Sequence, residues 1–218
     1  MDVVTAIKSR KSIRGYLPRE VPRSIIVEII ETALRVPSSK NSQPWEVTVV
    51  TGEPLDGIRR DNVTKILSGE SGGDFSPKTG VYRQRQIEAG VGLFKLMGIE
   101  RGDKDKRGEW LLRGYRFFDA PVAIIISASK VLQQTYAVFD VGALTHAICL
   151  AALDHGLGTC IEGQGVEFHD VIRKHVPLSE EQVIIAGIAL GYPDEGFPAN
   201  QFISSRALVD EVTYWVGY

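Results

Sequence analysis

Near the start of this chain, a short polar run separates a helix-like pattern of apolar residues from a strand-like one. Over residues 22–36, isoleucine and other apolar residues recur at the spacing of one buried helical face, and Pro22 suits a first helical position. Pro37 ends that pattern, because a proline disfavours helical geometry in the residue before it. Residues 46–51 alternate and are rich in β-branched side chains, which indicates a strand. The polar run is therefore a loop that leads from a helix into a strand.

This loop carries hydroxyl and amide side chains between two prolines. A loop held by rigid elements on both sides can direct short polar side chains toward a bound ligand. Serine, asparagine and proline are also common in ordinary turns, so a simple connector is the alternative for the loop alone. The residues of interest are Pro37, Ser38, Ser39 and Asn41, followed by Gln43, Pro44 and Trp45.

A second polar cluster precedes the helix and is rich in positive charge. Arginine offers a planar fork of donors that matches phosphate oxygens, and serine adds a small neutral donor. A phosphate group would suit this set, although a solvated basic patch near a terminus is the simpler explanation for the cluster by itself. The cluster consists of Lys8, Ser9, Arg10, Lys11, Ser12 and Arg14.

Four motifs in order make the chain resemble the FMN-dependent nitroreductase family. The first two are the Arg-x-Ser-x-Arg segment that begins at Arg10 and the Pro-Ser-x-x-Asn-x-Gln-Pro-Trp loop that begins at Pro37. Residues 83–85 and 98–103 resemble a branch with nitrobenzene and nitrobenzoate reductases. Because the motifs span almost the whole chain, their joint occurrence is a specific signal. The later motifs are Gly158-Thr159-Cys160-Ile161-Glu162-Gly163, and Leu190-Gly191-Tyr192-Pro193 followed by Ser204-Ser205-Arg206.

The resemblance implies an α+β fold in one domain over residues 1–218, with a central mixed, mainly antiparallel sheet flanked by helices, assembled as an intertwined homodimer. It implies an FMN-dependent oxidoreductase that takes hydride from NADH or NADPH and reduces nitroaromatic or quinone-like acceptors by a ping-pong mechanism. The flavin N5 atom would carry the chemistry, so no catalytic side chain is expected. Reductive dehalogenation, flavin fragmentation and a non-catalytic flavin-binding redox sensor are the alternatives.

The resemblance also assigns cofactor contacts to the basic cluster. Arg10, Ser12 and Arg206 match residues that grip the FMN phosphate and ribityl chain. Lys11 is a candidate for the charge that is missing where Ser204 replaces a lysine of many members. Arg14 matches a cation near the flavin N1 and O2 atoms, where it would stabilise the anionic reduced ring.

Further cofactor contacts are implied at the strand end and in the polar loop. Glu162 and Gly163 match a pair whose backbone donors approach the flavin O4 and N5 atoms. Arg113 and Arg116 stand where some relatives place asparagine and lysine, and their roles stay open. The residues that would reach a flavin bound mainly by the other subunit are Pro37, Ser38, Ser39 and Asn41.

Residues 68–110 form an insertion relative to the smallest family members. Residues 68–80 are dense in glycine, serine and proline, so they are expected to form either a lid over the substrate or a linker. Arg83 and Arg85 follow, and each could pair with the carboxylate or nitro group of an aromatic acceptor.

Composition argues against several other classes of protein. The net charge of -2 offers no basic excess for nucleic acid, and the longest apolar runs fall short of the roughly 20 residues of a membrane span. The N-terminus lacks the pattern of a secretory signal. Two cysteines, Cys149 and Cys160, without histidines at ligand spacing argue against disulfides and a metal site and favour the cytoplasm.

The rest of the chain predicts alternating helices and strands without internal repeats. The aromatic tail over residues 202–218 is expected to pack on a partner subunit or to fold back on its own. Helices are expected near the N-terminus and over residues 22–36, 54–67, 83–97, 104–117, 136–155 and 167–175, and strands over 46–51, 121–127, 157–161 and 183–190.

Overall fold

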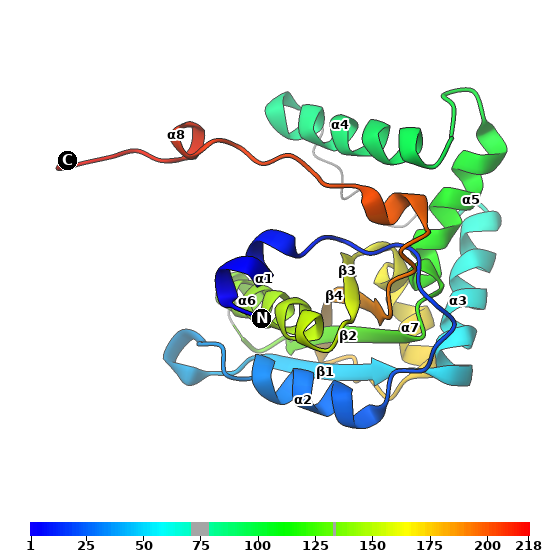
Figure 1. Ribbon diagram of the computed structural model, residues 1–218. Helices are drawn as coiled ribbons and strands as arrows, with labels where there is room; N and C mark the ends of the chain where they lie inside the picture. The colour runs from blue at the N-terminus through cyan, green and yellow to red at the C-terminus, as the bar shows by residue number, and fades with distance from the viewer. Residues whose placement is uncertain (71–78, 133) are drawn as a thin grey trace.

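The computed structural model describes residues 1–70, 79–132 and 134–218, and helices alternate with strands along the chain (Figure 1). All the expected helices and strands are present, with ends within a few residues of those expected. The helices are α1 (Val3–Ser9), α2 (Arg23–Ala33), α3 (Gly52–Leu67), α4 (Gly80–Leu96), α5 (Lys104–Tyr115), α6 (Gln134–Asp154), α7 (His169–His175) and the single turn α8 (Val209–Val212). The strands are β1 (Trp45–Val50), β2 (Val122–Ser129), β3 (Gly158–Glu162) and β4 (Gln182–Gly191).

The four strands form one sheet in the order β1-β2-β4-β3, and each neighbouring pair is antiparallel. Trp45 pairs with Ala128 at one edge, and Gly158 pairs with Gly191 at the other. A single parallel bridge joins Ser12 to Thr159 beside β3. The expected α+β fold with a mainly antiparallel sheet is confirmed: all four strands pair antiparallel, and the one parallel contact in the described part of the chain is this isolated bridge to the basic N-terminal segment.

Helices cover both faces of the sheet, and the two faces bury separate apolar clusters. Successive residues of β2 point to opposite faces, so Ile124 packs with α2 and α6 whereas Ile125 packs with α3 and α7. Seven of the eight residues of β2 are buried, because both of its faces are covered. This explains why the strand is a continuous apolar run in the sequence.

Helix α2 is shorter than the sequence predicts, since it ends at Ala33. Beyond Ala33, the amide of Arg35 donates to the carbonyl of Thr32 and that of Val36 to Ala33, which is the tighter spacing of a 3₁₀ turn. The tight turn satisfies the last carbonyls of the helix before Pro37 makes continuation unfavourable.

Helix α6 is a longer apolar segment than the sequence analysis expected. Within the described residues, Thr135–Asp154 is long and apolar enough to cross a membrane by length and composition. One face of α6 nevertheless packs on the sheet and on α2 through buried side chains such as Leu144 and Ile148. It is a core helix in this structure.

Two segments of the chain extend beyond the body formed by the sheet and its helices. Part of the expected insertion, residues 71–78, lies outside the described residues, and the remainder forms α4 and the first turns of α5. The C-terminal arm after the short turn η4 (Pro198–Gln201) runs past α4 and away from the body (Figure 1). Its aromatic end is exposed, with Tyr214 at 93% and Trp215 at 62% of full accessibility.

Candidate functional site

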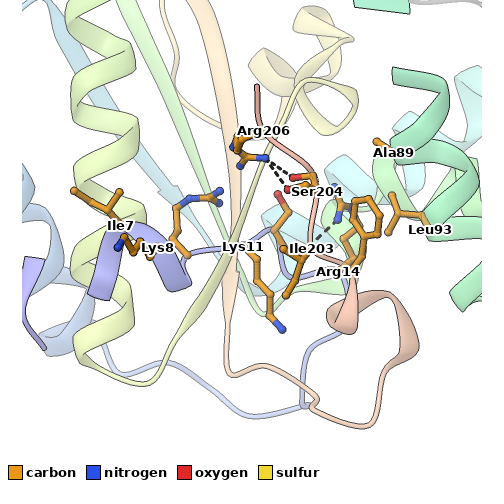
Figure 2. Close-up of a pocket in the computed structure, with 12 residues that line it drawn as sticks. Ile7, Lys8, Lys11, Arg14, Ala89, Leu93, Ile203, Ser204 and Arg206 are labelled. Atoms are coloured by element: carbon orange, nitrogen blue, oxygen red, sulfur yellow. Dashed lines mark hydrogen bonds between the residues drawn. The ribbon is translucent and has the colours of Figure 1, made fainter. Parts of the chain in front are cut away.

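Three segments that are far apart in the sequence enclose a cavity of about 570 Å³. They are the end of α1 with the chain that follows it, one face of α4, and the start of the C-terminal arm (Figure 2). Phe202 packs against α4 at Gly92, where an added Cβ would lie 2.5 Å from the ring. The lining residues are Ile7, Lys8, Arg10, Lys11, Ser12, Arg14, Ala89, Leu93, Phe202, Ile203, Ser204 and Arg206.

The lining carries a strong excess of positive charge. It includes five cationic side chains and no acidic one. In the part of the chain that the structure describes, none of the five forms an ion pair with a carboxylate. Arg206 instead donates to Ser204, at 2.6 Å to its hydroxyl and 3.1 Å to its carbonyl (Figure 2). It also donates to the Ser205 carbonyl at 2.8 Å. Like charges held together without counter-charges make this cavity a site for an anion.

The local sequence explains why the basic segment faces the cavity. Ile13 is buried and donates its amide to the Thr159 carbonyl at 2.9 Å, which fixes the segment along β3. Gly158 makes room for this contact, since a Cβ there would lie 2.5 Å from the Ile13 side chain. Neighbouring residues of an extended segment point to opposite sides. Ser12 and Arg14 therefore face the cavity while Ile13 is buried.

The end of β3 provides a buried carboxyl group and open space beside a glycine. Both carboxylate oxygens of Glu162 are buried and have no hydrogen-bond partner among the described residues. Burial raises the pKa of Glu162 well above its ordinary value, an effect that the charges of Arg14 and Arg59 oppose. A Cβ at Gly163 would meet no atom of the chain within 4 Å. Neither Glu162 nor Gly163 lines the cationic cavity.

The polar loop after α2 lies apart from the cationic cavity in the single chain. Ser39 instead helps to line a separate hollow of about 410 Å³, formed with the first turn of α6. Three residues of the loop that are not glycine have left-handed backbone, with φ of 52° at Lys40, 57° at Asn41 and 45° at Gln43. Such conformations are costly and occur preferentially at functional sites. The amide of Gln43 donates to the Ser38 hydroxyl at 3.0 Å, which holds the loop closed.

The structure separates the two arginines that the sequence assigns to substrate. Arg85 lines a hollow of about 310 Å³ that shares Phe202, Ser204 and Arg206 with the cationic cavity. Its Nη2 atom lies 4.0 Å from a carboxylate oxygen of Glu211 in the arm. Arg83 is exposed and lines neither hollow. Most of the expected lid, residues 71–78, lies outside the described residues.

Several supporting residues had no local signal in the sequence. Asn200 is buried and accepts hydrogen bonds from the amides of Arg14 and Gly15, at 2.7 and 3.2 Å. Asp140 accepts from the amide of Ser39, and Arg113 donates to the carbonyl of Arg14. The partners in these contacts are 99 to 186 positions apart, so only the folded chain reveals them.

Comparison with known proteins agrees with the motifs and the fold. The model of the Nitroreductase family matches residues 7–192. The chain belongs to the nitroreductase family. It is 30% identical to a 4-nitrobenzoate reductase of Pseudomonas putida, over 100% of this chain and 96% of the relative. It is 31% identical to a nitrobenzene nitroreductase of Ectopseudomonas oleovorans, over 96% of this chain and 95% of the relative.

A solved structure extends the likeness to three dimensions. The FMN and NADPH-dependent nitroreductase NfnB of Sphigopyxis sp. strain HMH is 30% identical and superimposes with a TM-score of 0.94 over 100% of both chains. The nitroreductase-like fold expected from the sequence is confirmed, as is the branch with nitrobenzene and nitrobenzoate reductases.

Proposed function

We propose that this protein is an FMN-dependent oxidoreductase that uses NADPH or NADH to reduce nitroaromatic compounds. The observation that carries the proposal is the cationic cavity. Its five cations, which form no ion pair among the described residues, and two serines make a donor set suited to the FMN phosphate. Membership of the nitroreductase family and the solved FMN and NADPH-dependent relative support the same cofactors. Reduction of a second substrate after release of the oxidised nicotinamide, a ping-pong mechanism, is part of this proposal.

The residues of the chain fit FMN by their chemistry. Arg10, Ser12 and Arg206 would hold the phosphate, with Lys11 supplying additional charge. Arg14 would face the pyrimidine side of the ring, and the backbone at Glu162 and Gly163 would approach its other side. The open space beside Gly163 is consistent with a flat group there. Bound FMN would supply the hydride and electron transfer, and the protein would bind, orient and exclude water.

We infer that two copies of the chain build each site. In one chain the loop of Ser38, Ser39 and Asn41 lies apart from the cavity, so it would serve the cavity of a partner. The first turns of α6 and the C-terminal arm expose large apolar side chains, including Phe139 at 75% and Tyr214 at 93% of full accessibility. Apolar surface of this kind marks a protein interface.

A mixture of variants tests this two-chain site. One variant would carry Arg10→Ala with Arg206→Ala, and the other Ser39→Gly with Asn41→Ala. If the loop serves the partner, a mixed dimer has one site with both parts intact, so mixing should restore FMN binding to a fraction of sites. If the loop served its own chain, every site would keep one defect and mixing would restore nothing.

Turnover tests the function directly. The purified protein should release FMN on denaturation and should consume NADPH or NADH when 4-nitrobenzoate is added without oxygen, with a reduced nitrogen group in the product. Dehalogenated or flavin-derived products would favour the alternative chemistries, and bound flavin without turnover would favour a redox sensor. A protein that does not bind added FMN would overturn the proposal.

A further inference from the structure

Contacts from distant parts of the chain fix the main chain at Arg14 on both sides. Its amide donates to the Asn200 side-chain oxygen at 2.7 Å, and its carbonyl accepts from Nη2 of Arg113 at 3.0 Å. The Gly15 amide donates to the same Asn200 oxygen at 3.2 Å, and the Asn200 side-chain nitrogen donates to the Gly15 carbonyl at 2.8 Å. The backbone that carries Arg14 is therefore held from η4 and from α5 together.

An aromatic ring supports the Arg14 side chain. The guanidinium carbon lies 5.8 Å from the centre of the Phe118 ring, within the range of a cation–π interaction. Phe118 belongs to the short turn η2 (Phe117–Asp119), in which all three residues have left-handed backbone, with φ of 55°, 51° and 59°. None is glycine, so this turn stores strain that the surrounding structure must oppose.

Arginines on α3 and α5 hold the strained turn in place. Arg59 donates to the Arg116 carbonyl at 3.0 Å and also to the carbonyl of Ala120. Arg113 and Arg116 both bind the Asp119 carboxylate, at 3.1 and 2.8 Å. The two α5 arginines therefore share a partner in the turn, but of the two only Arg113 donates to Arg14.

Arg113 occupies an unfavourable environment for a cation. Burial lowers the pKa of its guanidinium from the ordinary value, and its buried Nε has no hydrogen-bond partner among the described residues. Its guanidinium carbon lies 4.8 Å from the centre of the Phe197 ring. Arg113 is partly buried, and its ion pair with Asp119 leaves Nε without a partner in the described part of the chain. Its desolvation is therefore only partly offset, and it is expected to contribute little to stability by itself.

We propose that Arg113 is a positioning residue, which together with Phe118 aims the Arg14 guanidinium at the pyrimidine side of FMN. This inference rests on the proposed function. It assigns Arg113 a role through Arg14, since Arg113 does not line the cavity. The charge of Arg14 stabilises the anionic reduced flavin only if it is held near the ring, so its alignment should set the reduction potential.

The test compares the midpoint potential of bound FMN in four variants. Arg14→Met removes the cation, Arg113→Met removes its support, and Phe118→Leu removes the ring beneath it. Arg107→Met is the matched control, because Arg107 lies on the same helix but stacks on Phe94 and, among the described residues, forms no hydrogen bond or ion pair with Arg14 or with the turn. Thermal unfolding of each apoprotein reports folding separately from the potential.

We expect Arg113→Met and Phe118→Leu to lower the potential in the same direction as Arg14→Met. A loss of about tenfold in the preference for reduced over oxidised FMN corresponds to about 30 mV for a two-electron couple. Arg107→Met should leave the potential unchanged. In the double variant Arg14→Met with Arg113→Met, the potential should equal that of Arg14→Met alone, because the support acts through the missing side chain.

The outcomes separate the inference from the proposed function. If Arg14→Met lowers the potential but Arg113→Met and Phe118→Leu do not, the positioning role is wrong and the proposed function stands. If Arg113→Met fails to fold, the Phe118→Leu result decides. If wild-type protein binds no FMN, or if Arg14→Met leaves the potential unchanged, the assigned flavin contact fails and the inference fails with it.

Discussion

The backbone amide of Ser39 donates a hydrogen bond of 3.0 Å to the carboxylate of Asp140, which lies 101 positions later on α6. Asp140 is only 3% exposed, and the next residue on the helix, Val141, belongs to the apolar core. The contact anchors a loop with three left-handed residues that are not glycine. Because such backbone is strained, the loop depends on its anchor to keep its shape.

We therefore expect Asp140→Ala to loosen this loop. Loss of a hydrogen bond to a charged group costs about 1.5–3 kcal/mol, so the apoprotein should melt at a lower temperature. Trypsin should cleave faster after Lys40, which lies in the loop, and FMN should bind more weakly. Asp140→Asn keeps an acceptor oxygen and should largely restore all three properties.

Thr145→Val is the matched control for Asp140→Ala, because Thr145 is buried on the same helix and its hydroxyl donates only to Val141 within α6. It should not accelerate cleavage at Lys40. Equal cleavage rates in Asp140→Ala and wild-type protein would show that the loop holds its shape without this contact.

If the cationic cavity binds the FMN phosphate, substitutions in it should weaken the binding of FMN but not that of riboflavin. Arg10→Ala and Arg206→Ala should each weaken FMN binding by about one to two orders of magnitude, on the order of 1.5–3 kcal/mol for a charged hydrogen bond. Riboflavin lacks the phosphate, so its affinity should change little. Titration of the apoprotein, followed by flavin fluorescence, measures both.

Arg19→Ala is the control for these substitutions. The guanidinium carbon of Arg19 lies 3.8 Å from the centre of the Tyr192 ring, and Arg19 is outside the cationic cavity. It should bind FMN as the parent does. Retention of FMN by both cavity variants through extensive dialysis would refute the assignment of the phosphate to this cavity.

The sequence predicted much of this fold because periodicity is a local property. The apolar run of β2 and the buried face of α2 are visible within single segments. The cluster from Arg10 to Arg14 was also recognisable, since the cations are neighbours. The residues that hold this cluster in place could not be recognised in the sequence, because Arg113 and Asn200 lie 99 and 186 positions away from Arg14, which they contact.

The left-handed turn at Phe117 had no sequence signal either. Glycine or asparagine usually marks such backbone, whereas here two phenylalanines and an aspartate adopt it. Burial of Phe117 and the hydrogen bonds from Arg59 stabilise the turn, and both are tertiary contacts. A reader of the sequence alone would have continued α5 to this point.

We propose Arg85 instead of Arg83 as the residue that gives a preference for negatively charged acceptors. Arg85 lines the hollow beside the cationic cavity, so Arg85→Ala should raise KM for 4-nitrobenzoate more than for nitrobenzene. KM for the nicotinamide donor should change less. Arg83→Ala is the matched control on the same helix. Equal effects of the two substitutions on both acceptors would leave acceptor charge to other residues.

Burial of Glu162 predicts a pH dependence of stability. Its pKa is raised in the folded protein, so above the ordinary value of 4.5 the unfolded chain releases a proton that the folded chain retains. Stability must then fall as pH rises from 4.5 toward the raised pKa, by at most about 1.4 kcal/mol per pH unit. Glu162→Gln is neutral at every pH and should remove this contribution.

Urea unfolding of the two apoproteins at several pH values between about 5 and 8 measures the difference. The advantage of Glu162→Gln over the parent should grow with pH. A constant difference across this range would mean that Glu162 is ionised in the folded protein, and that Arg14 and Arg59 compensate its burial.

We expect one FMN site to accept electrons from a reduced nicotinamide and to pass them to a nitroaromatic compound. Anaerobic absorbance spectroscopy of the FMN-loaded protein separates these two steps. NADPH or NADH alone should bleach the flavin band, and 4-nitrobenzoate added after removal of the nicotinamide should restore it. A flavin that neither donor reduces, or that stays reduced when the nitro compound is added, would contradict the proposed function.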